Sequence, residues 1–181
     1  MRVIAGTARS LKLVAPEGLD VRPTIDRYKE TVFNILNQRV VGAEVLDLFA
    51  GSGANGIEAL SRGAASAVFV ENGLKAIESI ESNLKFTKLF DKASLMKYDY
   101  TKALMVLKEN GRQFDLIYLD PPFNSDYENQ VITSILSEGL LADGGILVCE
   151  SDRDTQIVVD IEGYEIYKEK SYKTCKFTFV R

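Results

Sequence analysis

Hydrophobic and polar residues recur with two different periods along this chain of 181 residues. Near the start, residues 2–5 and 11–14 form short strand-like runs around a turn at Gly6, which predicts a hairpin. From Thr24, a residue type that commonly caps helices, apolar positions recur at helical spacing to about residue 38. This part of the chain therefore predicts a hairpin followed by one helix.

Beyond residue 40, short apolar runs alternate with longer amphipathic stretches. Strands that recur with helices between them predict right-handed crossovers and a parallel sheet. The expected strands are 44–49, 66–70, 93–96, 114–119 and 144–149. The expected helices are 54–62, 73–87, 100–109 and 127–138.

The C-terminal end has a different pattern, in which two strand-like runs are separated by only a short turn. These runs are 163–170 and 174–180, with Ser-Tyr-Lys between them. Such close spacing predicts an antiparallel hairpin that forms an edge of the sheet. The length of the whole chain is typical of a single domain.

The composition is that of a globular protein, with 46% hydrophobic and 27% charged residues. No apolar run approaches the roughly 20 residues that cross a bilayer, and the N-terminus lacks the apolar segment of a secretory signal. There is no histidine, and Cys149 and Cys175 are the only cysteines. We therefore expect a reducing, cytoplasmic setting, no membrane partner, no metal site and no disulfide framework. Any proton transfer must use carboxylates, lysine, tyrosine or the backbone.

The net charge of −4 conceals an uneven distribution along the chain. Residues 1–39 and 163–181 each carry a net charge of +3, whereas residues 40–162 carry −10. Basic ends around an acidic body can present a face that attracts a polyanion, because local potential steers such partners more than total charge does. The same pattern could arise by chance from a few charges, so it leaves the partner open.

A glycine-rich motif follows the first expected strand of the sheet. Gly51, Gly53 and Gly56 have the G-x-G-x-x-G spacing of dinucleotide-binding loops, in which glycine lets the backbone approach a ligand closely. Glu71 ends the second strand, twenty residues after Gly51, where a carboxylate can accept both ribose hydroxyls. Both NAD and S-adenosylmethionine contain such a ribose, so these residues alone do not separate the two cofactors.

Asp47 favours S-adenosylmethionine over NAD. It lies just before the glycine turn, where a carboxylate would repel a pyrophosphate but attract the ammonium and sulfonium groups of S-adenosylmethionine. We count Phe49, in the same motif, with the cofactor-binding residues. Asp99, after the third strand, could accept from the adenine amino group, but it could equally be the N-cap of the helix that contains Thr101.

The second chemical motif is Asp120-Pro121-Pro122-Phe123, directly after the fourth strand of the sheet. Parallel sheets bind ligands at the carboxyl ends of their strands, so this loop should face the same crevice as the glycine turn. An exocyclic amine is a poor nucleophile because its lone pair is delocalised into the ring, and acceptors on its hydrogens favour a pyramidal nitrogen. The Asp120 carboxylate and the Pro121 carbonyl can be those acceptors, while Phe123 can stack on the base. The motif therefore predicts methyl transfer to an amine.

These motifs, together with a segment before the sheet, resemble the bacterial RsmD family of 16S rRNA guanine-N2 methyltransferases. The most specific part is the segment from Arg22 to Asn34, which begins Arg-Pro-Thr-Ile-Asp-Arg. The other matching parts are residues 2–6, 11–13, 47–53, 58–64 and 120–123, so the resemblance spans nearly the whole chain.

For these 181 residues the resemblance implies an α/β fold, a doubly wound and mostly parallel Rossmann-like sheet of seven strands in the order 3-2-1-4-5-7-6. It implies S-adenosylmethionine as cofactor and S-adenosylhomocysteine as product. The implied acceptor is the N2 of a guanine in small-subunit rRNA, within an assembling ribosomal particle. On this interpretation residues 1–40 are a hairpin-helix extension and residues 41–181 are the catalytic core of one domain.

The resemblance also brings Arg22, Thr24, Asp26 and Arg27 near the RNA or the cofactor. Thr24 and Asp26 could instead simply begin the helix, since both residue types favour helix N-termini.

Three alternatives use the same residues differently. Methyltransferases that act on adenine N6 of nucleic acids or on glutamine N5 of proteins also carry Asp or Asn before Pro-Pro and an aromatic residue, but the Arg-Pro-Thr segment favours rRNA. A nicotinamide dehydrogenase fits the glycine spacing, but Asp47 and the proline loop argue against it. A catalytically inactive RNA-binding module fits the charge pattern, but the intact Asp120 and Glu71 argue against it.

Overall fold

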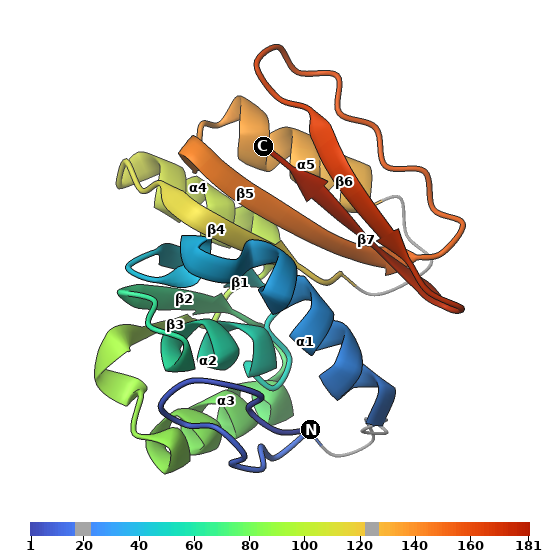
Figure 1. Cartoon of the computed structure of the whole chain (residues 1–181). Coiled ribbons are helices and arrows are strands. Elements are labelled where there is room, and N and C mark those ends of the chain that lie inside the picture. The colour runs from blue at the N-terminus through green and yellow to red at the C-terminus, as the bar shows by residue number, and fades with distance from the viewer. Residues whose placement is uncertain (17–22, 122–126) are drawn as a thin grey trace.

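The computed structural model describes residues 1–16, 23–121 and 127–181, with residues 23–25 described by their backbone alone. Helices cover both faces of one twisted sheet, and the N-terminal segment lies against the helices of one face (Figure 1). This arrangement is the doubly wound α/β architecture that the sequence predicts.

Seven strands of the described chain form a sheet in the order β3-β2-β1-β4-β5-β7-β6, as the resemblance implied. Strands β1 to β5 run parallel, whereas β7 pairs antiparallel with both β5 and β6. Their bounds are β1 Glu44–Leu48, β2 Ser66–Val70, β3 Ala93–Met96, β4 Phe114–Leu119, β5 Leu141–Asp152, β6 Ile166–Ser171 and β7 Cys175–Val180. The C-terminal hairpin therefore forms one edge of the sheet, which confirms the prediction from its short turn.

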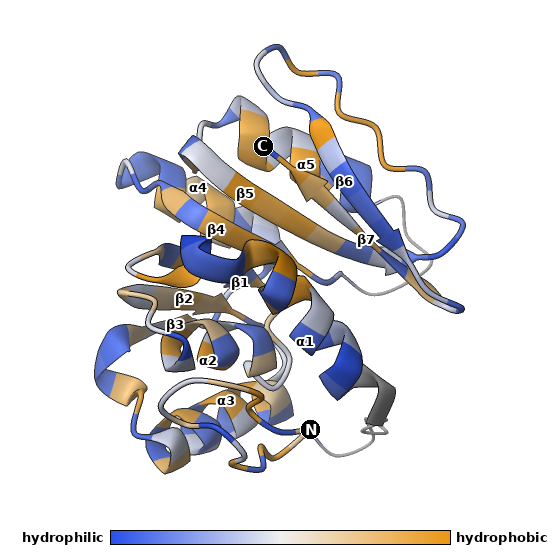
Figure 2. Ribbon diagram, in the orientation of Figure 1, coloured by the Kyte–Doolittle hydropathy of each residue, from blue (hydrophilic) through white to orange (hydrophobic). Residues whose placement is uncertain are grey.

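The described helices divide between the two faces of the sheet. Helices α1, α2 and α3 contribute to one buried core, and α4 and α5 to the other. Their bounds are α1 Pro23–Leu36, α2 Ala54–Ser61, α3 Leu74–Thr87, α4 Tyr100–Glu109 and α5 Tyr127–Ser137, with short 3-10 helices at Asn37–Val40 and Phe90–Lys92. Figure 2 shows the middle of β5 as hydrophobic and the edge strand β6 as largely hydrophilic, because helices or strands cover the first more completely.

Strand β5 is longer than the predicted run 144–149. It begins at Leu141, where an irregular register with β4 includes the two glycines, and it continues to Asp152 through pairing with β7. The apolar run marks the part of the strand that is covered on both faces. The neighbouring strands decide how far the pairing extends beyond it.

The N-terminal segment does not form the regular hairpin strands predicted for 2–5 and 11–14. Its two arms lie antiparallel, but they meet in one isolated bridge, between Arg2 and Lys12. The physical reason is that side chains of α2 and α3 bind backbone groups that a longer ladder of strand pairs would use. The prediction that the two arms run antiparallel is confirmed, whereas the prediction of two regular strands is wrong.

Ser61 and Asn83 are two of the side chains that hold this segment. The Ser61 hydroxyl accepts from Ala8 N–H at 2.9 Å. The Asn83 amide pairs with both backbone groups of Val14, at 2.8 Å and 2.9 Å. A Cβ atom at Gly6 would lie 1.8 Å from the Ser61 carbonyl oxygen, so the chain can approach α2 this closely only with glycine there.

A buried ion network joins the N-terminal segment, α1 and α2. The fully buried Glu58 accepts from Ile4 N–H at 2.8 Å and forms ion pairs with Arg62 at 2.7 Å and Lys29 at 3.3 Å. Burial lowers the pKa of Lys29, while the adjacent Glu58 carboxylate opposes that shift. Because an unpaired buried charge is costly, the network fixes α1 in one place beside the sheet.

Candidate active site

The glycine turn connects β1 to α2 at the carboxyl edge of the sheet. Gly51 and Gly53 have φ values of 56° and 76°, in the left-handed region that glycine adopts without strain. Phe49 has a φ of 64°, a conformation that costs about 1–2 kcal/mol for a residue with a side chain. A Cβ atom built on Gly51 would meet nothing within 4 Å, so this side of the turn faces open space in which a ligand can approach.

Asp47 lies beneath this turn and is only 1% exposed. Its Oδ2 accepts from Gly56 N–H at 2.8 Å. Glycine at position 56 lets α2 pack closely against Phe69 of β2, because a Cβ atom there would lie 2.3 Å from Cε1 of that ring. This close packing brings Gly56 N–H within reach of Asp47. Burial raises the pKa of Asp47 to about 8, and the charges of Asp120 and Glu71 add to the rise. A positively charged ligand would favour the ionised form of this carboxyl group.

Glu71 follows β2, and backbone amides hold its carboxylate. Oε2 accepts from Gly51 N–H at 2.8 Å, and Oε1 accepts from the N–H groups of Asn72 and Gly73, both at 2.9 Å. A carboxylate has about four acceptor positions, so one remains on Oε2. Glu71 is therefore fixed beside the glycine turn with one acceptor position left for a ribose hydroxyl. To accept from both ribose hydroxyls, one of its acceptor positions would have to accept from a hydroxyl and a backbone N–H at the same time.

Asp120 lies next to the glycine turn. Strands β1 and β4 are adjacent and parallel, with Leu48 opposite Leu119, so Phe49 and Asp120 leave the sheet side by side. The Asp120 N–H also donates to Leu48 O at 3.4 Å. The prediction that the two motifs open at one edge of the sheet is therefore confirmed.

Burial raises the pKa of Asp120 to about 7, so its carboxyl group titrates near neutral pH. Pro121 is buried directly after it. Pro122 and Phe123 lie outside the described residues. Stacking of a base on Phe123 therefore stays a prediction.

Asp99 is the N-cap of α4. Its Oδ1 accepts from Lys102 N–H at 3.0 Å and from the Thr101 hydroxyl. These hydrogen bonds, with that from Thr101 the stronger, lower the pKa of Asp99. The capping role is confirmed, whereas a contact with an adenine amino group stays a prediction that would use Oδ2.

Three aromatic rings, two of which the sequence analysis missed, form a row at the same edge. Phe49 and Tyr100 have ring centroids 5.3 Å apart, and Tyr100 and Tyr127 have centroids 5.7 Å apart. Flat rings beside the glycine turn can cover a planar group such as adenine. The signal for Tyr100 and Tyr127 was weak, since an aromatic residue at the start of a helix is common in a core.

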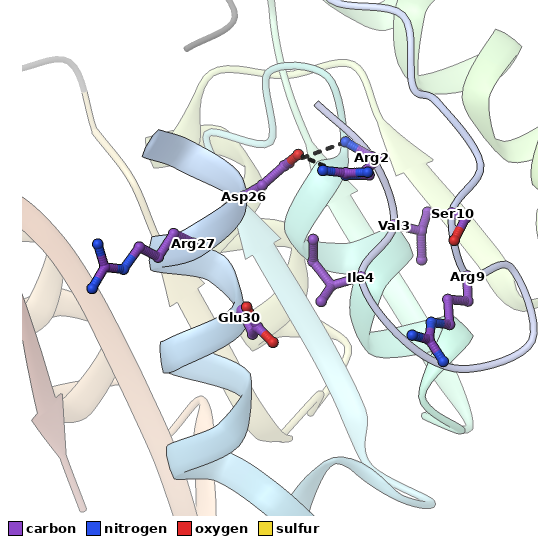
Figure 3. Close-up of a pocket in the computed structure, with 8 residues that line it drawn as sticks. All are labelled: Arg2, Val3, Ile4, Arg9, Ser10, Asp26, Arg27 and Glu30. Atoms are coloured by element: carbon purple, nitrogen blue, oxygen red, sulfur yellow. Dashed lines mark hydrogen bonds and ion pairs between the residues drawn. The ribbon is translucent and has the colours of Figure 1, made fainter. Parts of the chain in front are cut away.

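A cavity of about 320 Å³ separates α1 from the N-terminal segment and is lined by Arg2, Val3, Ile4, Arg9, Ser10, Asp26, Arg27 and Glu30 (Figure 3). Asp26 accepts from Arg2 N–H at 3.1 Å and pairs with its Nε at 3.3 Å, so it holds α1 to this segment. Arg27 is exposed and points away from that pair in Figure 3. Arg22 and the side chain of Thr24 lie outside the described residues.

In the parts of the chain that the structure describes, no group of three or more acidic, cysteine or histidine residues is arranged to hold a metal ion. None of the helices there combines the length and apolar character that a bilayer span requires. Cys149 and Cys175 are buried and unpaired with each other. Burial raises the pKa of both thiols, that of Cys175 to about 12, so neither is poised for chemistry.

The groups at this edge fit a ligand that combines positive charge with a ribose and a flat base. The buried Asp47 and the neighbouring Asp120 form no ion pair with any Lys or Arg of the described residues. Glu71 supplies an oriented acceptor, and the open side of Gly51 admits the ligand. A pyrophosphate would instead find no cation of the described residues paired with these carboxyl groups, which argues against the dehydrogenase alternative.

Solved structures share this architecture. The SAM-dependent methyltransferase from Agrobacterium tumefaciens matches with a TM-score of 0.62 and 20% identity, over 75% of this chain and 47% of that one, a likeness of fold. A conserved hypothetical protein from Streptococcus pyogenes matches with a TM-score of 0.77 and 36% identity, over 84% of this chain and 93% of that one. The fold is the one shared by the class of S-adenosylmethionine-dependent methyltransferases.

Within that class, the chain belongs to the RsmD family. The family model described as "Conserved hypothetical protein 95" matches residues 1–181. The Escherichia coli (strain K12) protein named "Ribosomal RNA small subunit methyltransferase D" is 34% identical over 170 residues, which cover 94% of this chain and 84% of that protein. The resemblance found in the sequence is therefore confirmed.

Proposed function

We propose that this protein transfers a methyl group from S-adenosylmethionine to the exocyclic N2 of a guanine in small-subunit rRNA. The observation that carries the proposal is the adjacency of Asp120 to the glycine turn, through the register of β4 on β1 and the 3.4 Å bond from Asp120 N–H to Leu48 O. An acceptor for amine hydrogens thus lies next to a turn suited to a cationic cofactor. The name of the Escherichia coli relative supports rRNA as the substrate.

The cofactor would lie along the edge from β1 to β3. When bound, it supplies a methyl group attached to a positively charged sulfur. Asp47 offers negative charge toward its amino-acid end, and Glu71 offers an acceptor to its ribose. The rings of Phe49 and Tyr100 can cover the adenine, and Asp99 Oδ2 can accept from the adenine amino group.

The acceptor amine would be activated by hydrogen bonding. The Asp120 carboxylate and the Pro121 carbonyl accept its hydrogens, which localises the lone pair on nitrogen and aims it at the methyl carbon. The nitrogen–carbon bond forms as the carbon–sulfur bond breaks, and one amine proton passes to a carboxylate. Because Asp120 must be ionised to accept, methyl transfer should decline as pH falls through its pKa of about 7.

Two arginine side chains, one on α1 and one on the N-terminal segment, support an RNA contact beside the cavity between them. Arg27 is exposed and forms no ion pair with a residue that the structure describes. Arg9 lines the neighbouring cavity (Figure 3). Guanidinium groups at such positions can bind phosphate oxygens, which would hold the target nucleotide without reading its base.

The decisive experiment incubates the protein with labelled S-adenosylmethionine and undermethylated small ribosomal subunits, and then maps the modified base by mass spectrometry. Wild-type protein should methylate one guanine at N2. Asp120→Ala should abolish transfer yet still bind S-adenosylhomocysteine. Asp143→Ala, which removes an exposed carboxylate from the opposite end of β5, should behave like wild type.

The location of the label distinguishes the proposal from its alternatives. Label on adenine N6, or on a glutamine of a ribosomal protein, would replace guanine as the acceptor. Full activity of Asp120→Ala would refute the role given to that carboxylate. Arg27→Ala should impair RNA methylation more than S-adenosylhomocysteine binding, and equal losses in both assays would argue against an RNA contact.

A further inference from the structure

Strands β4 and β5 bring a second carboxyl group next to Asp120. These parallel strands are in register to the point where Leu119 lies opposite Cys149. The next residues, Asp120 and Glu150, therefore lie side by side at the carboxyl edge. Tyr118, two residues before Asp120, is buried in the core beneath α1, α2 and α3, so the Asp120 side chain points to that face.

Tyr118 shows that Glu150 points to the same face. The Tyr118 hydroxyl donates to Glu150 Oε2 at 3.2 Å, and in the sheet Tyr118 lies opposite Asp47 of β1. Burial raises the pKa of Tyr118 well above its usual value, and the charges of Glu150, Asp120 and Asp47 add to the rise. The phenol therefore stays protonated and acts as a fixed hydrogen-bond donor to the Glu150 carboxyl group.

No described cation offsets the charge of this pair, since no Lys or Arg of residues 1–16, 26–121 and 127–181 forms an ion pair with Asp120 or Glu150. The other titratable groups that act on the pair are Tyr118 on β4, Asp47 on β1, the Cys149 thiol on β5 and the Cys175 thiol on β7. Burial and the Asp120 charge raise the pKa of Glu150 well above its usual value. Asp120 and Glu150 are both partly buried, and ionising two adjacent carboxyl groups is costly, which favours a pair that holds one proton.

We propose that Glu150 is a positioning residue for methyl transfer, and that the Asp120–Glu150 pair exchanges one proton for the positive charge of the methyl donor. This inference rests on the proposed function. The pair releases its shared proton when the sulfonium charge lies beside it, and Asp120, with the ionised Glu150 next to it, then accepts from the amine. As the nitrogen–carbon bond forms and the carbon–sulfur electron pair stays on sulfur, the pair takes up one proton from the amine. The total charge of the site is unchanged by the reaction.

With Glu150 beside it, Asp120 takes up the amine proton more readily than it would alone. A single ionised carboxylate becomes neutral when it takes up the amine proton, and a nearby sulfonium charge already lowers its proton affinity. In the pair, the second carboxylate repels the first, which raises the affinity for a proton once the charge on sulfur is gone. The acceptor is therefore strongest at the moment when the amine must lose its proton.

The test measures protons released on ligand binding, by calorimetry near pH 7 in buffers of different ionisation enthalpy. It compares S-adenosylmethionine with S-adenosylhomocysteine, which share the amino-acid end, ribose and adenine but differ in the charge on sulfur. Any proton that Asp47 releases toward the amino-acid end is common to both ligands and drops out of the difference. When wild-type protein binds S-adenosylmethionine, it should release at least roughly half a proton more per site than when it binds S-adenosylhomocysteine; this difference is the excess.

Three variants make the measurement specific. Glu150→Gln keeps an acceptor for the Tyr118 hydroxyl but cannot ionise, so the excess should fall at least about twofold. Asp120→Asn removes the other member of the pair and should do the same, which keeps the test open if Glu150→Gln does not fold. Glu169→Gln removes a half-exposed carboxylate on β6 that pairs with Lys176, and it should leave the excess unchanged.

Equal proton release with the two ligands in the wild type would overturn the inference, as would an unchanged excess in the two pair variants. If wild-type protein still methylates small subunits in either case, the proposed function survives and only the role of Glu150 is lost. Failure of the wild type to bind either ligand would overturn both.

Discussion

Replacing Asp47 by asparagine should remove a pH-dependent destabilisation of the folded protein. Asp47 is 1% exposed and its pKa rises from 3.8 to about 8 on folding. Above pH 3.8 the unfolded chain releases this proton while the folded chain retains it. Stability is therefore lost progressively as pH rises toward about 8. Asparagine does not titrate, and its side-chain oxygen can still accept from Gly56 N–H.

The magnitude follows from the two pKa values. Each unit of difference is worth about 1.4 kcal/mol between the protonation states. Between pH 5 and pH 8 the wild type should therefore lose about 3–4 kcal/mol from Asp47, and Asp47→Asn should not. For a domain of this size the difference corresponds to roughly 10 °C in Tm.

The assay is urea unfolding of the ligand-free wild type and Asp47→Asn at several pH values from about 5 to 8. The variant should gain stability relative to the wild type as pH rises. The same substitution should weaken S-adenosylmethionine binding, because it removes a carboxylate that the cationic ligand would ionise. Parallel stability curves for the two proteins would refute the argument that burial keeps Asp47 protonated.

The remaining predictions concern packing, the ion network and a helix cap. Gly56→Ala should destabilise by about 1–3 kcal/mol in urea unfolding, because the new Cβ atom would lie 2.3 Å from a buried phenylalanine ring; a neutral effect would contradict the packing. Lys29→Met should cost about 2–4 kcal/mol by leaving the Glu58 carboxylate with one cation fewer, and adding Glu58→Gln should recover part of the loss; purely additive losses would argue against coupling. Asp99→Ala should lower stability by about 1 kcal/mol through loss of the cap, seen in thermal melts, and an additional loss of S-adenosylhomocysteine affinity would support the adenine contact.

Local patterns predicted most elements because the forces that form them act locally. Strands 66–70, 93–96 and 114–119 and the helix 100–109 coincide with their predicted bounds. Strands β2 and β4 lie inside the sheet and are covered on both faces, so their apolar runs begin and end with the strands. The N-terminal segment was different, because its backbone groups are bound by Glu58, Ser61 and Asn83 from distant helices.

Three of the predicted site residues lie at the end of a strand or directly after it. Asp47 lies in β1 just before its turn, and Glu71 and Asp120 follow β2 and β4, so a parallel sheet brings all three to one edge. Glu150 was missed because it lies inside β5, where nothing local marks it as different from a solvated carboxylate. Asp26 near a ligand stays a prediction, and the fold gives this residue Arg2 as a partner.

By itself, the amino-acid sequence determined the order of strands and helices, the positions of the glycine turn and Asp120, and the family resemblance, because these depend on residue type and spacing along the chain. Only the tertiary structure decided which carboxyl groups lose their water and which acquire a cation. Asp47, Asp120 and Glu150 lie without a described ion-pair partner, whereas Glu58 is paired. Protonation state depends on solvent and neighbouring charge, and both are set by segments that are far apart in the chain.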